Sequence, residues 1–293
     1  MPIDERDPSP VTITPVASEP EPPATSGPGA IHLAAAAFEP GPLRVILLAL
    51  VAGVLSGLAA WLAWEAVSGY FAPQSEVVVI LGTAQSIVTP TGRVRAGIRG
   101  GAVAAAILGA AMGLALGLAG GFARRTARSG LVAGLAGAVL GTLGGISAAR
   151  VLLPVFYREE SPISGDLLLP LLTQGGVWIV VGAAGGLALG LGLGSFSLAF
   201  RAGLGGLLGA AIGATAFEAV GAFVFPHDET DQPVSKTWVT RLILRLLIAV
   251  LAATGAALAI QTGPRAKKPP EDGRRDLPSG GEDQIHDWRN AEK

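Results

Sequence analysis

Five charged residues stand inside or beside long uncharged stretches of an apolar sequence. They are Glu65, Glu218, Arg99, Arg241 and Arg245. A charge held at membrane depth costs about 2.5–3.5 kcal/mol on insertion scales, so such residues tend to pair with an opposite charge. Three kinds of chemistry are open to them: a glutamate–arginine pair that closes a helical hairpin, a proton- or ion-responsive site, or snorkelling of each side chain to the headgroups.

The spacing predicts which charges meet. Glu218 precedes the apolar segment that carries Arg241 and Arg245, and Glu65 stands in the same relation to Arg99. Neighbouring helices of one hairpin bring such ends together, so we expect one pair in the first hairpin and one in the last. The middle of the chain departs from this pattern, with Arg150 near the place of the acid and Gln174 near that of the arginine.

Other side chains offer no catalytic arrangement. The chain has no cysteine, which excludes disulfides and thiolate sites, and its three histidines (His32, His227 and His286) are not spaced as metal ligands. No phosphate-binding loop, dinucleotide fingerprint or nucleophile elbow occurs in a strand-to-helix context. We expect no catalytic, cofactor or metal site, no nucleic-acid partner and no enzymatic activity.

The elements that carry these charges are apolar helices. The 293 residues are 50% hydrophobic and only 15% charged, whereas soluble domains carry about 25% charged residues. Uncharged runs such as 45–64 and 167–200 reach the roughly 20 residues that a helix needs to cross a bilayer. The sequence therefore predicts an all-α integral membrane protein of about six transmembrane helices. Their predicted positions are near 43–67, 100–122, 130–152, 172–194, 202–224 and 240–260.

The segments outside these helices differ in composition. Residues 1–42 are rich in proline and acidic residues and 263–293 are charged, so both read as disordered tails. The connection 71–96 contains a β-branched run, Val77–Leu81, which predicts a surface strand or an interfacial stretch. The aromatic residues Trp61, Trp64, Tyr70 and Phe71 before it are typical of a membrane-interface belt.

Glycine recurs at every fourth position in two of the predicted helices. The rows are Gly109, Gly113, Gly117 and Gly121, and Gly182, Gly186, Gly190 and Gly194. Shorter rows mark the helices that follow them. Such spacing resembles the glycine zippers of several unrelated membrane proteins, in which small residues let backbones approach closely. We expect the rows to pack helices within the chain or against another copy or membrane protein. Lining of a pore is the alternative.

The glycine rows belong to a longer internal similarity. Residues 110–118 align with 183–191, with Gly113 opposite Gly186, and 252–260 form a looser third copy. The first, third and fifth helices then form one class and the second, fourth and sixth another. This pattern predicts three helical hairpins in tandem, all inserted in the same orientation.

The short loops set the orientation. Arg124, Arg125 and Arg128 lie between the second and third helices with no acid nearby. Because cytoplasmic loops are enriched in Lys and Arg, we expect this loop and both termini in the cytoplasm, in a bacterial-type inner (plasma) membrane. Arg93 and Arg95 stand against this rule.

These observations predict a non-enzymatic membrane scaffold, subunit or assembly factor. The alternative is a small transporter or channel with a site at the interface of the hairpins. A transporter should bring polar residues together at mid-bilayer. Only Thr142, Ser147 and Thr215 are candidates for that role.

Overall fold

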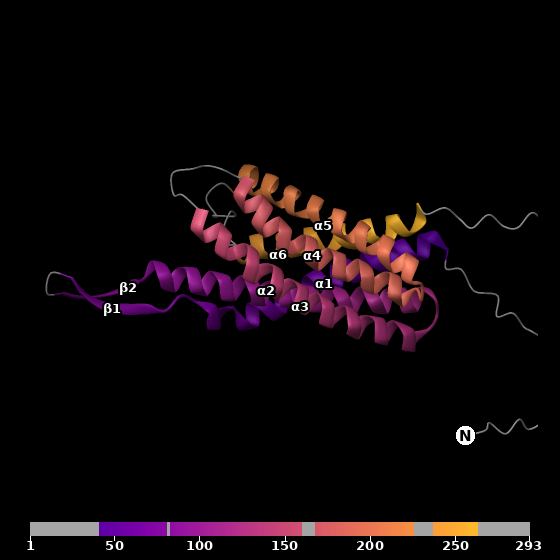
Figure 1. Ribbon diagram of the computed structural model, residues 1–293, viewed down its shortest axis with the longest axis horizontal. Helices are drawn as coiled ribbons and strands as arrows, with labels where there is room; N and C mark the ends of the chain where they lie inside the picture. Colours follow the sequence, from indigo (N-terminus) through magenta and orange to yellow (C-terminus); the bar gives the residue numbers. More distant parts are fainter. Residues whose placement is uncertain (1–40, 81–82, 160–167, 226–236, 263–293) are drawn as a thin grey trace, which may run out of the picture. The chain divides into compact units, whose positions relative to one another are not determined.

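The computed structural model describes residues 41–80, 83–159, 168–225 and 237–262 (Figure 1). The elements are α1 (Pro42–Val67), the 3-10 helix η1 (Ser68–Phe71), β1 (Ser75–Ile80), β2 (Thr83–Val88), α2 (Pro90–Ala123), α3 (Ala127–Glu159), α4 (Leu168–Gly192), α5 (Phe196–Val224) and α6 (Trp238–Gln261). Apart from Gly41 and Pro42, the predicted tails lie outside the described residues.

Six of these helices are long and apolar enough to cross a membrane. They pack against one another, and the leucines and valines they leave exposed include Leu131, Val132 and Leu135 along α3. Exposed apolar side chains of this kind suit contact with lipid tails. The fold is therefore consistent with an integral membrane protein.

Two helices extend well past the apolar stretches that predicted them. α2 begins at Pro90 rather than near 100, with Thr89 as its N-cap accepting a hydrogen bond from the backbone N–H of Gly92. Proline is favoured at the first position of a helix because its missing N–H would have no helical partner there. α3 continues to Glu159 through Pro154. Hydropathy located the bilayer-spanning part of each helix and missed the polar turns beyond it.

The connection between α1 and α2 is an antiparallel β-hairpin. β1 pairs with β2 in a register that sets Val77 opposite Ser86 and Val79 opposite Ala84. The predicted strand at Val77–Leu81 is present, shifted to Ser75–Ile80. We call the end of the bundle from which this hairpin emerges the hairpin end; it holds the last turns of α1 and the first turns of α2 (Figure 1).

The helices fall into an inner and an outer set. The inner set, α2, α4 and α6, makes contacts among its own members. Each outer helix lies against two inner ones: α1 against α2 and α6, α3 against α2 and α4, and α5 against α4 and α6. Burial follows the same division. Over their most apolar stretches, 56%, 67% and 44% of the residues of α2, α4 and α6 are buried, against 39%, 33% and 33% for α1, α3 and α5.

Apolar side chains fill the core of the bundle. Leu108, Met112 and Leu116 of α2 are fully buried, as are Leu189 of α4 and Ile248 of α6. The first and last of the six long helices complete the packing, because α1 contacts α6. Their far ends are also joined, with Nε2 of Gln261 donating to the carbonyl oxygen of Pro42 at 3.3 Å.

Candidate functional site

The most polar part of the described structure lies where α1 ends and α6 begins. Nε of Arg241 donates to Oε1 of Glu65 at 2.8 Å, and a second guanidinium nitrogen donates to Oε2 at 2.9 Å. Such two-point contacts between arginine and carboxylate are stronger than neutral hydrogen bonds and fix the relative orientation of both groups. The side chains of Arg241 and Glu65 are 16% and 28% exposed, so the pair is largely withdrawn from solvent.

The start of α6 positions Arg241. Thr237 caps this helix, and its Oγ1 accepts a hydrogen bond from the backbone N–H of Thr240. The hydroxyls of Thr237 and Thr240 are 2.8 Å apart, and Thr240 is fully buried. A threonine cap starts the helix at a defined residue, so Arg241 leaves the first turn of α6 at a fixed height beside the last turns of α1.

Arg245 lies one turn deeper on α6 and is only 3% exposed. Its guanidinium carbon is 5.5 Å from the centre of the Trp64 ring, within the range of a cation–π contact. Trp64 is itself buried and stacks on Phe71, with ring centres 5.8 Å apart. One guanidinium nitrogen of Arg245 and the indole nitrogens of Trp61 and Trp64 are buried without a hydrogen-bond partner in the described structure. Arg245 therefore packs against an aromatic ring, while Glu65 interacts with its charge from a greater distance than it does with Arg241.

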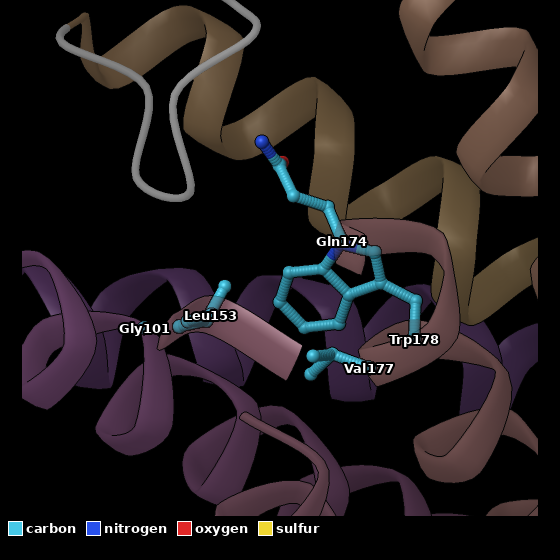
Figure 2. Close-up of a pocket in the computed structure, with 5 residues that line it drawn as sticks. All are labelled: Gly101, Leu153, Gln174, Val177 and Trp178. Carbon is cyan, nitrogen blue, oxygen red and sulfur yellow. The ribbon is translucent and has the colours of Figure 1, made fainter. Parts of the chain in front are cut away.

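Glu218 lies on the side of α5 that faces α4 and α6. It borders a small cavity between α4, α5 and α6, together with Gln174, Trp178 and Phe217. A second cavity lies on the other side of Gln174 and Trp178, closed by Gly101 and Leu153 (Figure 2). The second cavity has room for about one water molecule. The first cavity leaves no room for a water molecule, so neither cavity can hold a larger solute.

The predicted pairing of Glu65 with Arg99 of its own hairpin is wrong. Glu65 joins Arg241, on the sixth helix, and Arg99 of its own hairpin is exposed on α2. Arg245 lies over Trp64. The reason is the order of packing, because the ends of α1 and α6 are neighbours and present their long side chains to each other. In the middle of the chain, Arg150 is exposed on α3 and Gln174 is buried on α4.

The glycines of α2 face the backbone of α3. A methyl group added at Gly109 would overlap the backbone of Gly141, and one at Gly113 would overlap that of Gly137. Lower on the same interface, Gly117 lies against Gly134 and Gly121 against Gly130. At these positions the two backbones are too close for any side chain larger than hydrogen.

The α4–α5 interface repeats this arrangement. Gly182 faces Gly206, Gly186 faces Ala202 and Gly203, and Gly190 faces Ala199. Gly194, predicted as the fourth member of this row, lies outside the helix because α4 ends at Gly192. Its φ of 74° is in the left-handed region, which glycine adopts without the Cβ strain of other residues.

The turns after α2 and α4 have the same hydrogen bonds. Thr126 N–H donates to Gly121 O at 2.9 Å and Arg125 N–H to Phe122 O at 3.1 Å; Ser195 N–H donates to Gly190 O at 3.5 Å and Gly194 N–H to Leu191 O at 2.8 Å. Both are Schellman motifs, which end a helix with one left-handed residue. That residue is Gly194 in one turn and Arg125, with a φ of 60°, in the other.

The polar residues expected at mid-bilayer do not gather. Thr142 is half-buried, while Ser147 and Thr215 are exposed. Among the described residues, the buried polar side chains are Ser56, Thr173, Gln174, Thr240 and Arg245. All but Ser56 belong to the first turns of α4 and α6, at the hairpin end. Sequence reasoning placed Gln174 here, in the position of an arginine, but missed Thr240 and Trp178, whose only signal was their position near the start of a predicted helix.

No protein-family model matches the sequence, and searches of curated proteins and of solved structures also found no match.

Proposed function

We propose that the protein is a non-enzymatic membrane scaffold, subunit or assembly factor, built to hold a fixed arrangement of transmembrane helices. The observation that carries this proposal is the backbone-to-backbone packing of α2 on α3 and of α4 on α5. Helices in lipid associate through close van der Waals contact, and rows of glycine maximise it. A bundle packed this closely suits a rigid platform better than a carrier whose helices must move apart.

The packing supports an origin in three tandem hairpins joined by glycine zippers. The outer helices α1, α3 and α5 occupy equivalent grooves between the inner helices. In a repeat aligned on the two matching turns, Gly121 with Gly130 would correspond to Gly190 with Ala199, and Gly117 rather than Gly113 would be the counterpart of Gly186. Because the rows repeat every four residues, a sequence alignment can shift by one glycine and still match.

The transporter alternative has less support. Leu108, Met112 and Leu116 fill the space beside α2 where a central pathway would run. Glu65, Arg241 and Arg245 are concentrated at one end, and a coupled site is expected near the middle of the bilayer. We therefore interpret the ion pair of Glu65 and Arg241 as a structural contact that holds α1 against α6.

In the proposed orientation the turns around Arg125 and Gly194 and both termini face the cytoplasm of a bacterial-type inner membrane. The glycine rows of α2 and α4 are already occupied within the chain. A protein partner must therefore bind through another surface.

The test compares two properties of the full-length protein. Extracted from native membranes in mild detergent at its natural abundance, it should migrate as a discrete complex, well above its own 29.5 kDa plus detergent. Reconstituted alone in liposomes with a pH-sensitive dye and valinomycin, it should pass protons no faster than empty liposomes do. Migration as a single chain together with flux above that of empty liposomes would contradict the scaffold and favour the transporter.

A further inference from the structure

The β-hairpin is exposed on both faces. Glu76, Val77 and Val79 of β1 and every residue from Thr83 to Ile87 of β2 are exposed. Val77 and Val79 are 72% and 67% exposed. An isolated two-stranded hairpin is at best marginally stable in water, and a third strand or a packed element normally supports it. Within the described residues, the sheet contains only these two strands.

The strand edges also lack the usual protection. Proteins guard exposed edges with lysine, proline or bulges, because unpaired N–H and C=O groups recruit other strands. β1 is Ser-Glu-Val-Val-Val-Ile and β2 is Thr-Ala-Gln-Ser-Ile-Val, with Glu76 as their single charge. Such an edge is suited to accept an added strand from another chain.

The surface beside the hairpin is basic. Arg93, Arg95 and Arg99 are exposed on the first turns of α2. Arg158 is exposed on the last turn of α3, whose neighbour Tyr157 lies against Gly97 of α2. The hairpin adjoins this surface, since Gln74 at its base lies next to Gly92. The described acids nearby, Glu76 and Glu159, are fewer than these arginines.

Arg93 and Arg95 lie beyond the uncharged part of α2. The uncharged part of α2 starts at Gly100, so the turns from Pro90 to Arg99 add about 15 Å of helix outside it. With the edge of the hydrocarbon core at Gly100, Arg95 and Arg93 would lie about 7 and 10 Å beyond it, at or past the outer edge of the headgroup layer. The same charge disfavours pairing of two copies through their hairpins, because it would bring two basic surfaces together.

We propose that the hairpin and the arginines beside it bind an extended, acidic segment of a partner protein, which adds as a third strand. Main-chain hydrogen bonds to a free hairpin edge supply the pairing, and Arg93, Arg95, Arg99 and Arg158 select for carboxylates. This deepens the proposed scaffold function by naming the class of partner, and it rests on that function.

The test uses full-length protein in nanodiscs of phosphatidylcholine and a fluorescent peptide of alternating valine and glutamate. We expect the peptide to bind. A matched valine–lysine peptide should bind roughly tenfold more weakly or worse because its charge is reversed. A valine–glutamate peptide with alternate backbone nitrogens methylated should lose binding to the same degree, because it cannot donate along one edge.

Protein variants complete the test. The double variant Arg93→Glu/Arg95→Glu should lose roughly tenfold in affinity, whereas Arg124→Glu/Arg128→Glu, an equal change in charge on exposed residues at the opposite end, should leave binding unchanged. Equal binding of the lysine peptide or of the methylated peptide would overturn the proposal, as would no binding of the glutamate peptide. Loss of binding in nanodiscs that contain phosphatidylglycerol would assign the arginines to lipid and also overturn it. Because the peptide replaces the native partner, the result is independent of whether a native complex is recovered.

Discussion

Glu65 and Arg241 are 176 positions apart in the sequence, yet two hydrogen bonds of 2.8 and 2.9 Å join their side chains. The contact fastens the end of α1 to the start of α6. It is the one place in the described structure where opposite charges on these two helices meet at such short range.

Removing either partner should destabilise the protein. We expect Glu65→Gln and Arg241→Gln each to lower the free energy of unfolding by about 1.5–3 kcal/mol, the range for hydrogen bonds to charged groups. The double variant should lose less than the sum, because each single change leaves one charge without its partner. Unfolding in detergent measures this, with Glu76→Gln on the exposed hairpin as the control. Additivity within about 0.3–0.5 kcal/mol would show that the two residues act independently.

Arg245 should respond differently from Arg241. Replacement by methionine removes a buried guanidinium that lacks one hydrogen-bond partner and loses the contact with the Trp64 ring. The cation–π contact contributes about 0.5–2 kcal/mol, and the relief of burying a charge offsets part of it. We therefore expect Arg245→Met to lower the unfolding midpoint less than Arg241→Met does. The reverse order would mean that Arg245 supports more of the interface than its contacts indicate.

The glycine rows predict a contrast between two buried glycines. At Gly113 an added methyl group would overlap the backbone of Gly137, whereas at Gly175 the nearest atom is the Cβ of Ala214 at 3.8 Å. We expect Gly113→Ala to destabilise by about 1–3 kcal/mol through overpacking. Gly175→Ala should be neutral or slightly stabilising, because alanine favours helix more than glycine does. Thermal unfolding in detergent compares the two variants. Equal unfolding midpoints would show that the backbones of α2 and α3 lie further apart than described.

The two Schellman turns predict opposite effects at equivalent positions. A non-glycine residue in the left-handed region is strained by about 1–2 kcal/mol. Gly194→Ala should therefore destabilise the protein, the more so because Arg124 lies against Gly194. Arg125→Gly should stabilise it by relieving the same strain. Thermal unfolding compares both with the parent chain, and a shift of the same sign for the two variants would contradict the equivalence of the turns.

The proposed orientation is tested with single cysteines in a chain that has none. Cysteine at Thr126, in the turn after α2, should resist an impermeant maleimide added to intact cells. Cysteine at Gln85, on the exposed hairpin, should react. Both should react after the membrane is made permeable. Labelling of position 126 alone in intact cells would reverse the orientation.

Hydropathy and glycine spacing were sufficient to predict six long apolar helices. They could not predict how far α2 runs beyond the apolar stretch, because the turns around Arg93 and Arg95 are helical without being hydrophobic. Hydropathy and glycine spacing also could not predict the partner of Glu65, for a different reason. Local spacing favours a partner on the next helix, and only the packing of α1 against α6 reveals the actual one. Glycine spacing likewise could not show that α4 ends at Gly192, before the last glycine of its row.

The contact between the first and last helices has a consequence for how the protein is made. At a synthesis rate of about 5–20 residues per second, Arg241 emerges roughly 10–35 s after Glu65. During that interval α1 has no α6 to pack against, and the carboxylate of Glu65 stands at the edge of an unfinished bundle. The first helix must therefore remain at the insertion machinery, or packed against α2, until the last helix has been synthesised.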